Sequence, residues 1–208
     1  MKREAEIKEL LINNVIRLVA EGGFEKATTK AITYSGETLS DIKLNEVYIY
    51  RLFENKEHLY ERTFEFLDAK LLFAFKDAVG EIDEIGTEIK NKLNKVFLKV
   101  WCFVLENETV CRCYVRYYYS VYFRGRSLEV HNKHFESVIE AFLPLFKKEA
   151  DVKAIMHCVF TTLLDFAIRV YNGELENNSI NASNIFNVIY CVMSSYFREG
   201  ISVVETKP

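Results

Sequence analysis

The stretch LNEVYIYRLFENKEHLYERTF, residues 44–64, decides how the N-terminal part of this chain folds. Apolar side chains recur in it at helical spacing. Asn45 and Asn55 stand where helices begin, because an asparagine side chain accepts hydrogen bonds from the first free amides of a helix. We expect one helix beginning at Asn45 and a long helix running from Lys56 past Phe66. Tyrosines and cations gather at these two helix starts, an arrangement that favours contact with phosphates.

Two more helices are expected before this stretch. Apolar residues spaced by three and four positions predict a first helix over residues 7–19, with Gly22 and Gly23 as its stop signal. Thr28 or Thr29 is a suitable N-cap for a second helix, which we expect to end near Gly36.

The rest of the chain has the pattern of an all-α protein. Only 2 prolines and 8 glycines occur in 208 residues, and half of the residues are hydrophobic. Such a scarcity of breakers favours long helices over sheets. We expect about nine helices in total, the later ones over about 56–80, 84–105, 108–124, 127–147, 151–173 and 182–199.

Composition limits the classes of function. The chain has no run of 18 apolar residues, and its first residues, MKREAEIKEL, lack the apolar core of a secretory signal. Its five cysteines are odd in number and lie mostly in apolar runs, which is typical of reduced thiols in a cytosolic protein. We therefore expect a soluble, cytoplasmic protein that does not enter a membrane. The net charge of −3 excludes a globally basic nucleic-acid binder but leaves room for a local basic surface.

Two strings in the chain carry a family resemblance: VIRLVAEGGFEKATTKAI, residues 15–32, and NEVYIYRLFENKEHLY, residues 45–60. They resemble the DNA-binding end of the TetR-type transcriptional regulators, with a Gly-aromatic turn, a threonine cap, Tyr-x-x-Phe and Lys-Glu in the family's order. The resemblance implies a helix-turn-helix DNA-binding domain over residues 1–65. It also implies a helical effector-binding and dimerisation domain over residues 66–208.

The chain departs from the family between Ile32 and Leu44, where it has the longer segment TYSGETLSDIK. Either the second helix is extended or an extra turn precedes the third helix. A further alternative places the second helix at residues 38–42. The added residues bear on the angle at which the protein docks on DNA, compared with its relatives.

The resemblance and the geometry of a helix-turn-helix assign DNA contacts to the third helix and its surroundings. Glu46 is suited to accept from cytosine N4 and Arg51 to contact guanine, while Tyr50 and Lys56 are suited to bind phosphates. The alternative is that Tyr48 and Tyr50 pack in the core. The predicted DNA-binding residues are Thr28, Asn45, Glu46, Val47, Tyr48, Tyr50, Arg51 and Lys56.

Charge sets the expected strength of this contact. Residues 1–62 contain ten lysines and arginines against eleven acidic residues, a formal charge of −1. Because DNA affinity depends on neutralised phosphates, we expect weaker binding than in more basic relatives, or reliance on a dimer that engages two half-sites.

An aromatic-rich stretch in the middle of the chain is the candidate effector site. Rings and hydroxyls of this kind line small-molecule pockets, although they also form ordinary cores. The predicted ligand-binding residues are Phe97, Trp101, Tyr114, Tyr117, Tyr118 and Tyr122. The effector itself is an unknown small molecule.

The resemblance further implies a homodimer formed by the helices at about 151–171 and 183–197. Both are apolar around much of their circumference, which favours a partner on their outer side. A twofold dimer would present paired recognition helices to palindromic, double-stranded operator DNA.

No cofactor, metal site or catalytic constellation is expected. His131 and His134 have a spacing that can ligate a metal, but we expect a surface pair. The favoured hypothesis is a ligand-responsive regulator, most often a repressor, that a small molecule releases from its operator. One alternative is a helical interaction protein of the same fold that has lost specific DNA binding. The other, a helical enzyme, has no support in the sequence, and we expect no enzymatic activity.

Overall fold

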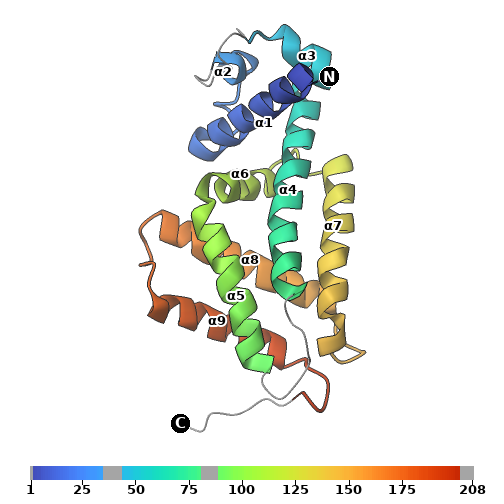
Figure 1. Ribbon diagram of the computed structural model, residues 1–208, viewed down its shortest axis with the longest axis vertical. Coiled ribbons are helices and arrows are strands. Elements are labelled where there is room, and N and C mark those ends of the chain that lie inside the picture. Colours follow the sequence, from blue (N-terminus) through green and yellow to red (C-terminus); the bar gives the residue numbers. More distant parts are fainter. Residues whose placement is uncertain (1, 35–43, 81–88, 202–208) are drawn as a thin grey trace. The chain divides into compact units, whose positions relative to one another are not determined.

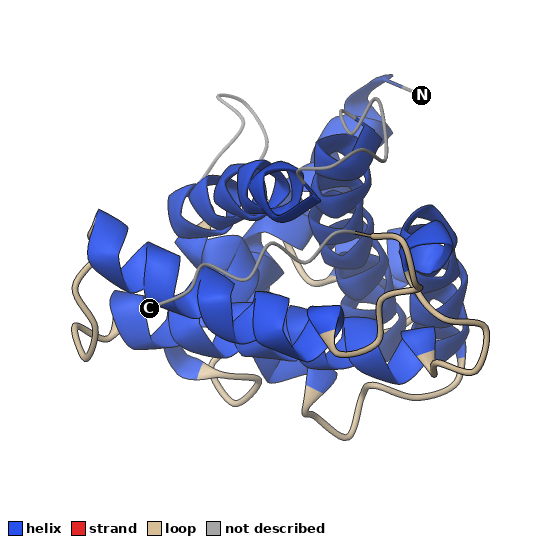
Figure 2. Ribbon diagram, turned by 90° about the horizontal axis from the view of Figure 1, so that it is seen from below, coloured by secondary structure: helices blue, strands red, loops and turns tan. Residues whose placement is uncertain are grey.

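The computed structural model describes residues 2–34, 44–80 and 89–201. Within these ranges the chain forms nine α-helices, and pairing of extended segments is confined to an isolated bridge between Phe146 and Phe197. The expected all-α fold class is confirmed (Figure 1, Figure 2). The helices are α1 (Lys2–Gly22), α2 (Thr29–Tyr34), α3 (Val47–Phe53), α4 (Lys56–Gly80), α5 (Ile89–Glu106), α6 (Glu108–Tyr118), α7 (Arg126–Phe142), the 3-10 helix η1 (Leu143–Leu145), α8 (Val152–Tyr171) and α9 (Ser179–Ser194).

Internal contacts divide the chain into two compact units. The N-terminal unit consists of Met1–Lys70 and Glu108–Asn132, and the C-terminal unit consists of Leu71–Asn107 and Lys133–Pro208. Helices α4 and α7 therefore contribute residues to both units. Residues 108–132, which the sequence assigns to the effector domain, pack with the N-terminal unit. The compact units do not test the predicted boundary between a DNA-binding domain and an effector domain near residue 65, which stays a prediction.

Helix α1 follows the apolar spacing of its sequence. Ile7, Leu11 and Val19 are buried along one face. The helix ends at Gly22, and Gly23 has a φ of 78°, a left-handed conformation that glycine adopts without steric strain. The N–H of Gly23 donates to the Val19 carbonyl at 2.9 Å, so the predicted stop signal is confirmed.

Two of the predicted N-caps are confirmed. Thr28 Oγ1 accepts a hydrogen bond from the N–H of Ala31 at 3.1 Å, and Asn55 Oδ1 accepts from the N–H of His58 at 2.7 Å. These caps fix where α2 and α4 begin. The expected end of the second helix and the alternatives for the added segment fall in residues 35–43, outside the described residues.

Three later helices end five or more residues before the expected position, among them the helix expected over 182–199, which ends at Ser194. The helix expected over 108–124 ends at Tyr118, where the N–H of Ser120 already donates to the Tyr117 carbonyl in a turn. The helix expected over 127–147 ends at Phe142, because Pro144 in η1 has no amide N–H to continue the α-helical ladder.

Aromatic side chains hold the N-terminal unit together. The Tyr60 hydroxyl, on α4, donates to the Ala27 carbonyl at 2.7 Å, and its ring meets those of Phe24 and Tyr122 at centroid distances of 5.0 and 5.1 Å. These contacts tie α4 to the connection between α1 and α2. Helix α1 also packs against α6, and Arg116 Nη1 donates to the Val19 carbonyl at 3.0 Å.

A buried polar cluster joins three helices of the same unit. His131 Nδ1 lies 2.8 Å from Asp68 Oδ1, and the Tyr114 hydroxyl donates to the same oxygen at 3.2 Å. All three residues are buried. A carboxylate is buried at low free-energy cost only when hydrogen bonds satisfy it, so the Asp68 cluster makes α4, α6 and α7 depend on one another.

The stability of this unit is expected to fall at alkaline pH through Tyr117. Burial raises the pKa of Tyr117 to about 12, above the value of about 10 for tyrosine in an unfolded chain. Below pH 10 both states keep the proton and stability is unaffected. Between pH 10 and 12 the unfolded state loses the proton first, so the free energy of unfolding decreases as pH rises.

The Tyr117→Phe variant should lose this component, which is at most about 2 kcal/mol at pH 12. Urea titrations of both proteins from pH 8 to 12 measure it. The stability difference between parent and variant should change in the variant's favour above pH 10. Tyr119→Phe, at an exposed tyrosine, is the control. A constant difference across this range would contradict the assignment.

The C-terminal unit is built around α5, α8 and α9, which pack on one another (Figure 1). Asp151 Oδ1 caps α8 by accepting from the N–H of Ala154 at 2.9 Å, and Asn178 Oδ1 caps α9 by accepting from the N–H of Asn181 at 2.8 Å. The last helix therefore begins at Ser179, before the expected residue 182.

Helix α8 is long and apolar enough to cross a membrane, judged by length and composition alone. A single helix of this kind is weak evidence for a membrane span, because core helices of soluble proteins share the property. In this structure, eight of its side chains, among them Ile155, Phe160 and Leu164, are buried within the protein.

Candidate functional site

Helix α3 has a buried side and an exposed side. Ile49 and Phe53, four residues apart, are buried, and α3 packs on α1. Val47 and Tyr50 are 66% and 56% exposed, and Arg51 is exposed as well. The core alternative is therefore wrong for Tyr50. The predicted DNA-contact residues Val47, Tyr50 and Arg51 are therefore accessible on the outer side of α3.

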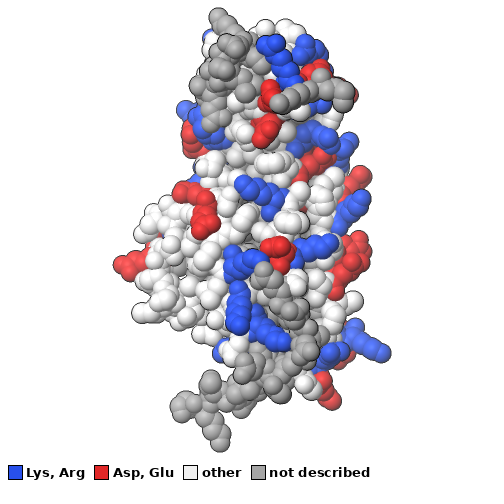
Figure 3. Space-filling model, in the orientation of Figure 1, with Lys and Arg blue, Asp and Glu red and all other residues white. Residues whose placement is uncertain are grey.

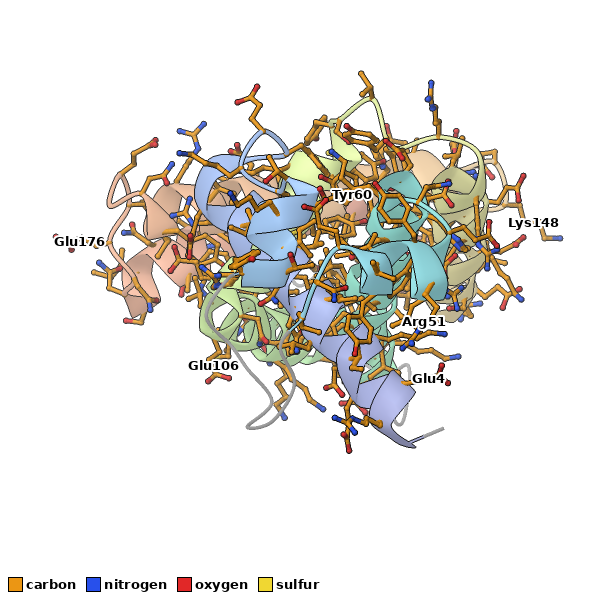
Figure 4. The ribbon with its side chains drawn as sticks, turned by 90° about the horizontal axis from the view of Figure 1, so that it is seen from above. Glu4, Arg51, Tyr60, Glu106, Lys148 and Glu176 are labelled. Carbon is orange, nitrogen blue, oxygen red and sulfur yellow. The ribbon has the colours of Figure 1, made fainter. Side chains whose placement is uncertain are left out.

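Arg51 and Tyr48 lie together on this outer side. The Arg51 guanidinium carbon is 4.7 Å from the centroid of the half-buried Tyr48 ring, within the range of a cation–π contact. Stacking restricts a long side chain that would otherwise sample many rotamers. Figure 4 shows Arg51 at the outside of α3, whereas Tyr60 lies among the surrounding side chains.

The start of α3 is held by hydrogen bonds within the chain. Asn45 Oδ1 accepts from the N–H of Val47 at 3.1 Å, so Asn45 precedes the helix, which begins at Val47 and not at Asn45 as expected. Glu46 Oε2 accepts from the Thr29 hydroxyl at 2.7 Å, which links the beginnings of α2 and α3. The DNA role of Glu46 stays a prediction, as does that of Asn45.

A tight turn connects α3 to α4. Glu54 has a φ of 67° and a ψ of −46°, and the N–H of Asn55 donates to the Phe53 carbonyl at 2.7 Å. This is a three-residue γ-turn, a strained conformation for a residue other than glycine. The turn sets the direction in which α4, beginning at Lys56, follows α3. Lys56 Nζ lies 5.6 Å from the centroid of the Tyr60 ring.

Basic and acidic side chains are interspersed over the surface shown in Figure 3. This agrees with the near-neutral charge of residues 1–62. Any DNA contact therefore depends on where individual cations stand more than on a broad positive field.

The predicted ligand-binding residues divide between the two compact units. Phe97 and Trp101 are buried in the C-terminal unit, with ring centroids 5.9 Å apart, and Phe97 lines an apolar cavity there. The four tyrosines Tyr114, Tyr117, Tyr118 and Tyr122 belong to the N-terminal unit.

Aromatic neighbours within their own unit surround these four tyrosines. Tyr114 and Tyr117 stack on Phe64, Tyr118 packs on Phe123, and Tyr122 packs on Phe24. The Tyr117 hydroxyl also shares a hydrogen bond of 2.9 Å with Ser127. Their packing resembles an ordinary core, and their ligand role stays a prediction.

Sequence reasoning missed most of the cavity lining in the C-terminal unit. Phe75, Phe142, Met156 and Tyr190 contribute to it from four different helices. Their positions in the sequence show only that they belong to apolar helical faces, which is a signal that every core residue shares.

The histidine pair is not the surface pair that we expected. His131 is buried on Asp68, whereas His134 is half-buried. Among the residues that the structure describes, no group of three or more histidine, cysteine, aspartate or glutamate side chains is placed to hold a metal ion.

Comparison with known proteins shows which fold these helices form. No protein-family model matches the chain, and no curated protein matches it. Solved structures do. A TetR family transcription regulator from Marinobacter aquaeolei VT8 matches with a TM-score of 0.70 and 17% identity, over 92% of this chain and 98% of that one. SmeT, the repressor of the Stenotrophomonas maltophilia multidrug efflux pump SmeDEF, matches with a TM-score of 0.61 and 14% identity, over 97% and 95%.

These likenesses show the fold of the chain. The chain has the fold of the TetR-family transcription regulators, which confirms the resemblance found in its sequence.

Proposed function

We propose that this protein is a DNA-binding transcription regulator that acts by binding and not by catalysis. The observation that carries the proposal is the exposed outer side of α3, with Val47, Tyr50 and Arg51 directed away from the buried Ile49 and Phe53. In a helix-turn-helix unit, the exposed side of the second helix is the side that contacts the bases. The likeness in fold to known transcription regulators supports DNA as the molecule that this side contacts.

A homodimer is the proposed state on DNA. Helix α9 exposes Ile180, Val188 and Cys191, and α8 exposes Ala154 and Cys158, so apolar side chains of both helices face solvent in the single chain. A second copy of α8 and α9 would cover them through a twofold interface. The paired α3 helices would then contact half-sites roughly 34–36 Å apart.

Release by a small molecule is the proposed form of regulation, with repression as the output. The C-terminal unit contains the cavity in which an effector would bind. For the effector to release DNA, it must favour one arrangement of the dimer and the operator another, so that each weakens the binding of the other. The resulting protein is a cytoplasmic, ligand-responsive repressor.

The test is a selection of random duplexes by the purified protein, followed by sequencing. Enrichment of a palindrome, bound by two chains per duplex, is the expected result. If the folded protein enriches no sequence, the proposal is overturned in favour of a helical interaction protein that does not read DNA. The near-neutral charge of the first 62 residues would then explain why the protein does not bind DNA.

A further inference from the structure

An open groove of the N-terminal unit has a volume of about 560 Å³. Residues of α1, α3 and α4 and the first residue of α7 line it, and all of them belong to this unit. The predicted DNA-binding and ligand-binding residues are not among the described residues that line it. Small-molecule sites have volumes of roughly 300–1,000 Å³, so the groove has room for a ligand larger than a simple ion.

Basic side chains outnumber acidic ones around the groove. Lys8, Arg62 and Arg126 are exposed cations. Among the described residues that line the groove, Glu65 is the only one with a carboxylate. These four side chains carry a formal charge of +2, with His58, which also lines the groove, counted as neutral. Since residues 1–62 as a whole carry a charge of −1, positive charge is concentrated at the groove, where it attracts an anion.

A shared carboxylate holds the two arginines of the groove next to each other. Arg62 Nη1 donates to Glu65 Oε2 and Arg126 Nε donates to Glu65 Oε1, each at 2.5 Å. The other nitrogens of both guanidiniums have no partner among the described residues. Two neighbouring guanidiniums with donors left over are suited to an oxyanion that accepts several hydrogen bonds, as a phosphate does.

An exposed aromatic ring also lines the groove. Phe66 is 44% exposed and packs on no other aromatic ring of the described residues. The half-buried side chains of Ile12 and Leu52 add apolar surface to the lining. Apolar surface and a free ring face beside paired guanidiniums are complementary to a ligand that has an aromatic ring as well as an anionic head.

We propose that this groove binds a small organic phosphate, whose phosphate accepts hydrogen bonds from Arg62 and Arg126 and whose aromatic ring packs on Phe66. Lys8, on α1, adds a further cation to the lining. The site shares no residue with the apolar cavity of the C-terminal unit. The inference goes beyond the proposed function and does not depend on DNA binding.

Isothermal titration calorimetry of the full-length protein with phenyl phosphate tests the inference. At about pH 8 and about 0.15 M salt, a phosphate monoester carries close to two negative charges. We expect phenyl phosphate to bind about tenfold more tightly than phenyl sulfate, which has one charge. It should bind about fivefold more tightly than inorganic phosphate, which lacks the ring. Phenol, which has the ring alone, should not bind measurably.

Arg62→Gln and Arg126→Gln are the informative variants, and each should weaken phenyl phosphate binding by about tenfold. Arg124→Gln is the matched control, because Arg124 is an exposed arginine of the same unit that does not line the groove. It makes the same change in net charge and should bind as the parent does. Phe66→Leu should remove the preference for phenyl phosphate over inorganic phosphate. Thermal melting shows that each variant is folded.

Failure of phenyl phosphate to bind the folded parent protein would overturn the inference. Equal losses in Arg62→Gln, Arg126→Gln and Arg124→Gln would also overturn it, because the effect would then be one of overall charge. A labelled duplex of random sequence is the last comparison. If the duplex binds, phenyl phosphate does not, and Arg126→Gln weakens the duplex, the groove contacts the DNA backbone and the inference is overturned.

These outcomes are separate from those of the duplex selection. Selection of a palindrome without phenyl phosphate binding would leave the regulator proposal standing and remove this one. Phenyl phosphate binding without a selected duplex would do the reverse.

Discussion

Replacing Asp68 by alanine is expected to lower the free energy of unfolding by about 3–5 kcal/mol. The Asp68 carboxylate is completely buried and is the shared partner of His131 Nδ1, at 2.8 Å, and of the Tyr114 hydroxyl, at 3.2 Å. Removing it leaves both partners buried without the acceptor that α4 supplies. The loss exceeds that of an ordinary hydrogen bond because two buried groups lose a charged acceptor at once.

Urea unfolding followed by circular dichroism measures this loss. Asp165→Ala is the matched control, because Asp165 pairs with Arg169 on the exposed side of α8 and should change stability by less than about 1 kcal/mol. A smaller loss for Asp68→Ala than for the control would show that the Asp68 cluster does not brace the N-terminal unit.

A second large effect is expected on DNA binding. Arg51→Glu should reduce affinity for the selected duplex by about a hundredfold, because it removes a cation from the outer side of α3 and places a carboxylate against phosphates. The side chain is exposed and its contact is with Tyr48 on the same helix, so the free energy of unfolding should change by about 0.5 kcal/mol or less.

Lys148→Glu is the control for Arg51→Glu, since it makes the same change in net charge at an exposed residue of the C-terminal unit (Figure 4). Fluorescence anisotropy with a labelled duplex at several salt concentrations compares the two. If both variants lose affinity equally, the effect is one of overall charge. That outcome would exclude α3 as the reading element.

Caps and stops that depend on nearby residues were predicted best, whereas the expected starts of α3 and α9 were wrong. Thr28, Asn55 and the stop at Gly23 were all identified, because a cap depends on a side chain and on amides only two or three residues away. The ends of α6 and α7 were less predictable. Apolar spacing continues beyond them, so the sequence pattern alone does not show where the helix stops.

The candidate site was predictable only in part. Val47, Tyr50 and Arg51, which were predicted to contact DNA, are exposed on α3, whereas Ile49 and Phe53 are buried. Glu46 was assigned to a base, but it bonds to Thr29 in this structure. Nothing in the sequence indicates that pairing, because the two residues belong to different helices.

By itself, the sequence determined the all-α class, the caps of α2 and α4 and the stop of α1, since these follow from interactions between residues a few positions apart. The tertiary structure alone decided that Asp68 meets His131, 63 residues later, and that the Tyr190 hydroxyl is buried without a partner among the described residues. Such partners come together only when helices pack. A side chain's own type does not specify which distant group will lie beside it.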